Sequence, residues 1–235
     1  MFLALRRLLF RDRGTEEQGA RELSLSGLFI FEFVVVLLGV LAAQTIQNVA
    51  QTANERRIAR TAVKDFERDK ADFVDFIAYV EHATPCVEAY LDALHDRADF
   101  NANEDTIATP KVLIPQPWVT AWDAQTIRAV VDRYDRDIYQ DHTNLERYSQ
   151  RLFEADREAS ALWGTVSVLQ RPGSMEQPLL RAEVHSALGQ LAANWQQVER
   201  AARGAAAVTS GMEVPVTTDR VNGALSGIPG CETRI

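Results

Sequence analysis

Hydrophobic residues are concentrated in one N-terminal segment of this chain of 235 residues, whereas apolar and polar positions are interspersed in the rest. Residues 28–43 read LFIFEFVVVLLGVLAA, and Glu32 is the only charged residue among them. The apolar run extends over residues 23–46, and a helix needs about 20 apolar residues to cross a hydrocarbon core of ~30 Å. The pattern therefore predicts a transmembrane helix over 23–46, preceded by a short basic tail over 1–22.

The tail and the flanks of this segment bear on its orientation. The first ten residues, MFLALRRLLF, suit an amphipathic segment on the cytoplasmic leaflet, and a frayed tail is the alternative. A cleaved secretory signal usually has an apolar region of only ~7–15 residues, so we expect an uncleaved signal anchor. Five basic residues precede the span and four follow it closely, a weak bias. The short tail favours a cytoplasmic N-terminus and an exported C-terminal domain.

Three residues within the span predict contact with another helix. An ionised Glu32 is costly in hydrocarbon, so it is protonated, paired or close to the headgroups. The alternative is that the apolar core begins near Phe33 and that Glu32 reaches back to the interface. Gly39 and Ala43 form a small-x-x-x-small pattern, which allows two helices to approach closely.

Apolar residues at helical spacing continue beyond the span. No Gly or Pro interrupts residues 40–84, and we expect one helix over 25–82 that emerges from the membrane as a stalk. Thr84 and Pro85 resemble an N-cap followed by the first residue of a helix, which predicts a second helix over 85–97. Further helices are predicted over 124–133, with Asp123 as its N-cap, and over 135–169 and 175–208.

The connections complete an all-α prediction: a transmembrane helix that continues into a stalk and an antiparallel helical bundle over 47–208. Residues 98–120 contain three prolines and read as a loop. Trp118 and Trp122 are candidates to line a pocket in the bundle. Residues 209–235 read as an irregular tail that packs back on the domain.

Composition and motifs argue against several classes of function. A net charge of −8 is unsuited to a general nucleic-acid binder. The sequence lacks a phosphate-binding glycine loop, a nucleophile elbow and a zinc-protease motif, so we expect no enzyme activity and no cofactor. The best candidate for a metal is Asp92-x-x-His95-Asp96-x-x-Asp99, but no second motif accompanies it. We interpret this run as a solvated acidic face and expect no metal site.

The two cysteines, Cys86 and Cys231, both follow the predicted span. An oxidising compartment would permit a disulfide that ties the C-terminal tail to the bundle. The alternative is a small core residue at Cys86 and an exposed thiol at Cys231, because the sequence does not show whether the Cα atoms approach within ~7 Å.

The span and its exit resemble a group of uncharacterised bacterial single-pass membrane proteins. The similarity lies in residues 31–44, FEFVVVLLGVLAAQ, followed by Gln47-Asn48 and Glu55-Arg56-Arg57. Residues 120–123, TAWD, are similar to a Thr-x-Trp element in the helical domain of some members. The resemblance implies a bacterial inner-membrane protein with one span, and it implies no reaction.

These observations predict a non-enzymatic, membrane-anchored helical module that acts as an accessory subunit or scaffold. Its partners would be the lipid bilayer and either another membrane protein or further copies of itself. A periplasmic sensing bundle that binds a ligand and signals through a partner is the alternative.

Overall fold

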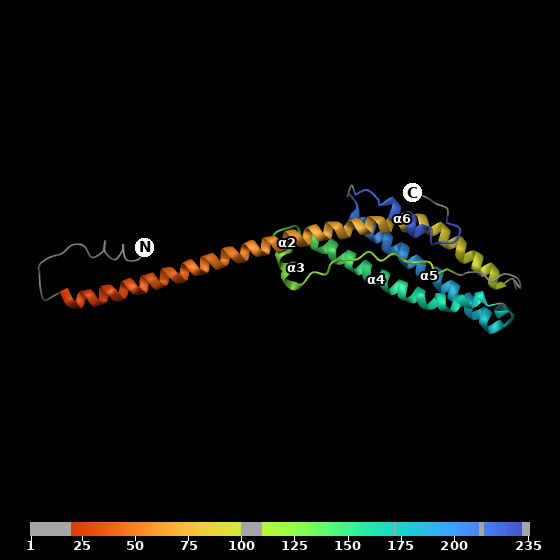
Figure 1. Ribbon diagram of the computed structural model, residues 1–235, viewed down its shortest axis with the longest axis horizontal. Helices are drawn as coiled ribbons and strands as arrows, with labels where there is room; N and C mark the ends of the chain where they lie inside the picture. The colour runs from red at the N-terminus through yellow and green to blue at the C-terminus, as the bar shows by residue number, and fades with distance from the viewer. Residues whose placement is uncertain (1–19, 100–109, 172, 212–213, 232–235) are drawn as a thin grey trace. The chain divides into compact units, whose positions relative to one another are not determined.

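The computed structural model describes residues 20–99, 110–171, 173–211 and 214–231. The chain divides into two compact units, Met1–Asn54 and Glu55–Ile235, and each is described by itself. Helix α2, Ala20–Asp99, contributes to both units (Figure 1). The described ranges contain helices and no strand, which confirms the predicted all-α class.

The first unit consists of the N-terminal part of α2. Its large apolar side chains are exposed between residues 29 and 49, with fractions such as 75% for Phe29, 64% for Val36 and 60% for Leu38. This helix is long and apolar enough to cross a membrane, and the mean hydropathy of its most apolar window is 2.3. The predicted amphipathic tail, 1–22, lies almost entirely outside the described residues.

The second unit is built on three helices whose buried residues recur every seven positions. Two such series lie on α2: Ala59, Phe66, Phe73, Val80, Val87 and Leu94, and Ala62, Asp69, Phe76, Ala83 and Tyr90. Helices α4 (Arg136–Val166) and α5 (Pro178–Thr209) repeat the pattern with Leu145, Leu152, Ala159 and Val166, and with Val184, Leu191, Val198 and Ala205. A repeat of seven keeps one face of a helix against its neighbours, as in coiled-coil packing.

Contacts between α2 and α5 show that these helices are antiparallel. The Trp195 Nε1 donates a hydrogen bond to the Thr84 Oγ1 at 3.1 Å. The Nδ1 atoms of His185 and His95 lie 3.0 Å apart. Residue numbers therefore fall along α5 while they rise along α2.

Contacts between α4 and α5 show that these two helices are also antiparallel. The Asn194 Nδ2 donates to the Ala155 carbonyl at 3.0 Å, and the Gly204 backbone lies against the Tyr148 ring. A Cβ at Gly204 would come within 2.5 Å of that ring, so a glycine allows this close approach. Because α5 is antiparallel to both neighbours, α2 and α4 are parallel to one another.

Parallel α2 and α4 require a connection that returns along the bundle, and residues 110–122 provide it. We call this extended segment the strap. On α2, the Tyr79 hydroxyl donates to the Leu113 carbonyl at 2.8 Å, and Asp69 accepts from the Thr120 backbone N–H at 2.7 Å. On α4, the Ser149 hydroxyl donates to the Pro117 carbonyl at 2.8 Å. Side chains of both helices thus hold the backbone of the strap. Figure 1 shows the strap running back along the bundle to α3.

The short helix α3, Ala124–Val131, follows the strap. Asp123 is its N-cap, as predicted, and accepts a hydrogen bond from the Thr126 backbone N–H at 2.7 Å. Ala129 and Val130 of α3 pack against Ala59 and Ala62 of α2 in a small separate cluster.

The predicted break at Pro85 is wrong. Pro85 lies inside α2, and the Thr84 hydroxyl donates to the Val80 carbonyl instead of capping a new helix. Ala83 and Val87 on either side are buried at 0% and 2% exposure, so the helix continues with its packed face. A proline within a helix removes one backbone hydrogen bond, and the packing of the flanking turns outweighs this loss.

The tail was predicted as irregular but contains helix α6, Thr218–Leu225. Val221 and Leu225, four residues apart, are buried against the core together with Ile228. Asp75 of α2 accepts from the Thr217 N–H at 2.7 Å and so holds the start of α6. The tail does pack back on the domain. The 3₁₀ helices η1, Ser167–Gln170, and η2, Ser174–Glu176, flank the predicted turn before α5.

Candidate functional site

The three span residues that predict a partner share one face of α2. Glu32, Gly39 and Ala43 are separated by seven and four residues, so they project within about 40° of one another at 100° per residue. All three are exposed, and a Cβ added at Gly39 would meet nothing within 4 Å. Glu32 makes no hydrogen bond or ion pair with the residues that the structure describes. The structure therefore places these residues together on one exposed face of α2.

Cys86 and Cys231 form a disulfide, which was one of the two alternatives that the sequence left open. Their Cα atoms lie 5.3 Å apart, and the bond closes a loop with a sequence separation of 145. The second unit of the chain is therefore crosslinked from the middle of α2 to the segment after α6.

Trp118 and Trp122 lie in different surroundings. Trp118 lies on the strap, and 74% of its surface is exposed. Trp122 stacks on the His142 ring with a centroid distance of 3.8 Å, and its edge meets Phe66. The Trp122 Nε1 is buried without a hydrogen-bond partner in the described part of the chain. The pair is thus one surface side chain and one packing side chain.

His142 links α4 to the strap. The ring is buried, with 2% of its surface exposed, and its Nε2 lies 2.8 Å from the Thr120 carbonyl oxygen. Because a carbonyl oxygen only accepts, we assign the donated hydrogen to Nε2. The hydrogen bond to Thr120 and the stack on Trp122 therefore tie the end of the strap to α4.

A polar cluster that sequence analysis missed joins the C-terminal end of α2 to the N-terminal part of α5. His185 of α5 lies between two residues of α2: its Nδ1 is 3.0 Å from the His95 Nδ1, and its Nε2 is 2.9 Å from the Asp99 Oδ1. The Asp99 carboxylate accepts, so we assign a hydrogen to the His185 Nε2. With both imidazoles neutral, the His185 Nδ1 then accepts from the His95 Nδ1–H. His185 is 90 residues from His95, and no local pattern indicates the pair.

The predicted acidic motif does not assemble a metal site. Two of its four residues, His95 and Asp99, are engaged by His185 as described. The other two, Asp92 and Asp96, are exposed. Within the described ranges, no group of three or more histidine, cysteine or acidic side chains is arranged to hold a metal ion.

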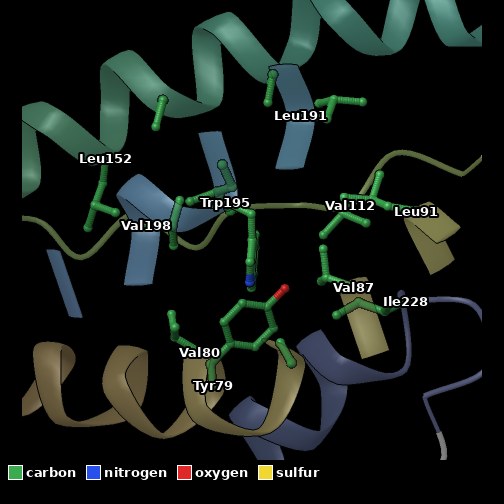
Figure 2. Close-up of a cluster of buried hydrophobic side chains, with 14 of the residues drawn as sticks. Tyr79, Val80, Val87, Leu91, Val112, Leu152, Leu191, Trp195, Val198 and Ile228 are labelled. Atoms are coloured by element: carbon green, nitrogen blue, oxygen red, sulfur yellow. The ribbon is translucent and has the colours of Figure 1, made fainter. Parts of the chain in front are cut away.

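A cavity of about 20 Å³ lies between α2, the strap, α4 and α5. Apolar side chains form most of its wall, including Trp163, Trp195 and Val112, with Asn194 as the polar member. Figure 2 shows Trp195 above Tyr79 in this part of the core, and their rings meet at an interplanar angle of 71°. A space of this size holds about one water molecule.

Two tyrosines fix the strap as permanent donors. The Tyr79 hydroxyl donates to the Leu113 carbonyl, and the Tyr90 hydroxyl donates to the Pro110 carbonyl at 3.2 Å. Burial raises the pKa of Tyr79 well above its usual range, and burial raises the pKa of Tyr90 to about 12 while nearby Arg97 opposes the shift. Both phenols therefore stay protonated at physiological pH.

No protein-family model, curated protein or solved structure matches the chain.

Proposed function

We propose that this protein is a non-enzymatic helical module anchored in a bacterial inner membrane by one span, acting as an accessory subunit or scaffold of a membrane protein complex. The exposure of its large apolar side chains between Phe29 and Val49 carries the proposal. An apolar helix in a soluble core would be covered by its own chain, and exposed apolar surface of this extent is unfavourable in water. Insertion in hydrocarbon removes that cost.

The disulfide supports a cytoplasmic N-terminus and a periplasmic helical domain. Disulfides persist in oxidising compartments and are rare in the cytosol. Cys86 and Cys231 both belong to the second unit, and their bond supports an oxidising compartment for that unit. This argument is independent of the basic flanks, which differ by a single residue.

The shared face of Glu32, Gly39 and Ala43 supports a partner within the membrane. An exposed carboxylate in a span is costly unless it is protonated or paired, and contact with another helix supplies a partner. Small residues on the same face allow the backbones to approach closely. We propose that this face contacts another membrane protein, with contact between copies of the chain as the competing outcome. Membership of the bacterial single-pass group that the span resembles is part of the same proposal.

The sensing alternative receives less support from the geometry. A cavity of about 20 Å³ accommodates one water molecule, which is far below the ~300–1,000 Å³ of typical small-molecule pockets. The two tryptophans that suggested a pocket lie apart from this cavity, which other side chains line.

Purification of the tagged protein at native level in mild detergent tests the proposal. The mass of the particle and the identity of its components would be measured by mass spectrometry. We expect a stoichiometric second membrane protein, and we expect Glu32→Leu with Gly39→Leu to release it. A particle that contains only this chain would contradict the accessory-subunit proposal.

The matched control places the same bulk on another face of the helix. Thr45→Leu lies roughly 140° from Glu32 at 100° per residue and should leave the complex intact. Carbonate extraction of membranes separates failure of anchoring from failure of partnering. Protein that is released by carbonate would contradict the membrane anchor itself.

A further inference from the structure

Three exposed cations follow the apolar segment along α2. Arg56, Arg60 and Lys64 are spaced four residues apart, which places them along one face of the helix, and we call them the basic collar. All three side chains are exposed. None makes an ion pair or hydrogen bond with the residues that the structure describes.

The helical domain covers the other face of this part of α2. Ala59 and Ala62 are buried against α3, and Phe66 is buried at the edge of the main core. At 100° per residue these positions project on average more than about 120° away from the basic collar. The collar is therefore a surface that the domain leaves uncovered.

The charge around the collar contrasts with the rest of the domain. No acidic residue occurs between Arg56 and Lys64, and Glu55 before them is paired with Arg133 at 2.9 Å. Residues 65–235 hold 16 basic and 27 acidic residues. The collar is thus a local positive surface on an acidic protein, and it fits a negatively charged partner.

Other exposed cations of the domain lack this segregation. Arg147, Arg151 and Arg157 on α4 are exposed and make no ion pair with the described residues. Acidic residues are interspersed among them, namely Glu146, Glu154, Asp156 and Glu158. This stretch offers the same number of cations without a net positive surface.

The position of the collar in the chain indicates which negative surface it meets. Val49 is the last large exposed apolar side chain before the collar, and Arg56 follows it by seven residues. Seven residues of helix rise about 10 Å. The polar layer on each side of a bilayer is roughly 5–8 Å thick, and the potential of an anionic surface extends about 8 Å further at physiological ionic strength. Arg56 is therefore within reach of the headgroups, whereas Arg60 and Lys64 lie about 16 Å and about 22 Å beyond Val49 along the helix and meet only the outer, screened part of the surface potential.

We propose that the basic collar attracts anionic phospholipids to the membrane surface from which α2 emerges, with Arg56 binding lipid phosphates directly and with Arg60 and Lys64 acting through the surface potential. The proposal rests on the membrane anchor proposed above. The anionic surface attracts the exposed guanidinium and ammonium groups, and this attraction offsets the repulsion between an anionic membrane and the acidic domain. The protein then distinguishes anionic lipids from zwitterionic lipids through residues outside its span.

Lipid binding to the full-length protein in detergent provides the test. Native mass spectrometry would count bound lipids during titration with phosphatidylglycerol and, separately, with phosphatidylcholine. We expect the wild-type protein to bind phosphatidylglycerol on the order of tenfold more tightly. The Arg56→Gln, Arg60→Gln, Lys64→Gln variant should lose this preference, and added salt should weaken it in the wild type.

The control variant is Arg147→Gln, Arg151→Gln, Arg157→Gln, which removes the same charge from α4 and should keep the preference. Equal binding of both lipids by the wild type would overturn the proposal. An equal loss of the preference for phosphatidylglycerol in the collar variant and in the control variant would also overturn it. A collar variant that keeps its lipid preference but loses a co-purifying protein would assign the collar to an acidic protein surface instead. Carbonate extraction of each variant reports on the membrane anchor separately, because wild-type protein released by carbonate would contradict the anchor and not the collar.

Discussion

Two buried acidic side chains on α2 hold the strap and the start of α6, two segments whose position the seven-residue repeat of the helices does not determine. Asp69 and Asp75 occupy largely buried positions, with 3% and 8% of their surface exposed. Each accepts a backbone N–H at 2.7 Å, from Thr120 in the strap and from Thr217 at the start of α6. A hydrogen bond to a charged group is stronger than one between neutral groups, so single residues fix the course of whole segments.

Asp141 and Asp123 predict opposite pH effects for the same substitution. Burial raises the pKa of Asp141, with Lys70 opposing this shift, so the ionised form destabilises the fold and stability falls as the pH rises through that pKa. We expect Asp141→Asn to raise the Tm at pH 7 and to have little effect near pH 3. Thermal unfolding followed by circular dichroism across this range measures the difference.

Asp123→Asn is the matched comparison. The hydrogen bond from the Thr126 backbone N–H lowers the pKa of Asp123, so its charge stabilises the fold above the unfolded-state pKa and the benefit is lost as the pH falls through the folded-state pKa. Asparagine is also a good N-cap, and we expect a small loss of Tm at pH 7 that vanishes in acid. If the change in Tm varied with pH in the same way for Asp141→Asn and Asp123→Asn, the opposite pKa shifts of the two residues would be contradicted.

For single residues, a local sequence pattern predicts contacts with neighbouring residues but does not predict contacts between residues far apart in the sequence. The N-cap at Asp123 depends on the next three residues and could be predicted from them. The contact of His185 with His95 depends on the packing of α5 on α2, and nothing near either residue indicates it. For the same reason the sequence did not decide whether Cys86 and Cys231 form a disulfide, because the distance between their Cα atoms depends on the fold.

Among the elements, α2 shows how tertiary packing overrides a local signal. Thr84-Pro85 has the residue types of a helix start, yet the buried positions repeat every seven residues from Ala59 to Leu94 without a shift. Breaking the helix at Pro85 would move one part of this face out of register with α5. The seven-residue repeat of buried positions therefore keeps α2 continuous, and Pro85 lies on the exposed side of the helix.

Replacement of Pro85 by alanine should stabilise the second unit. Alanine restores a backbone N–H in the helix and is about 3 kcal/mol more favourable than proline there. Alanine also gives the unfolded chain more conformational entropy, which lowers the free energy of unfolding by about 1 kcal/mol. Because Pro85 is exposed, the change leaves no cavity. We expect a gain of about 2 kcal/mol in the free energy of unfolding, measured with denaturant.

Glu88→Ala, at an exposed position three residues later, is the control and should be nearly neutral. Lower stability of Pro85→Ala together with a loss of helical signal would show that the proline is needed for the geometry of α2.

Long, strongly periodic elements could be predicted, and short ones could not. The apolar stripes of α4 and α5 span several turns, and both helices begin and end within about three residues of the sequence-based estimates. Helix α6 has eight residues and only two buried positions, Val221 and Leu225, which is too short a pattern to recognise. The course of the strap depends on hydroxyl and carboxyl groups of other helices, so its path is not encoded in its own residues.

For the whole molecule, the strap and the disulfide determine the topology. The strap carries the chain back along the bundle, so that α4 starts beside the part of α2 near Asp69 and runs parallel to it. The disulfide then joins the segment after α6 to Cys86. Both connections link parts of the chain that are far apart in sequence.

Reduction of the disulfide should lower the stability of the second unit. The bond closes a loop with a sequence separation of 145, and loss of a native disulfide of this kind costs about 2–5 kcal/mol. We expect a lower denaturant midpoint with reductant, and the Cys86→Ala, Cys231→Ala variant should match the reduced wild type. A midpoint unchanged by reductant would show that the tail packs equally well without the crosslink.

The crosslink has a consequence for proteolysis. A single cut in the backbone anywhere between residues 86 and 231 divides the polypeptide, but the C-terminal fragment stays attached through Cys231 to Cys86. Cys86 is on the same continuous helix as the apolar segment. A nicked molecule would therefore keep both fragments attached to α2, whose apolar segment is the proposed membrane anchor, and would release the C-terminal fragment only after the disulfide is also reduced.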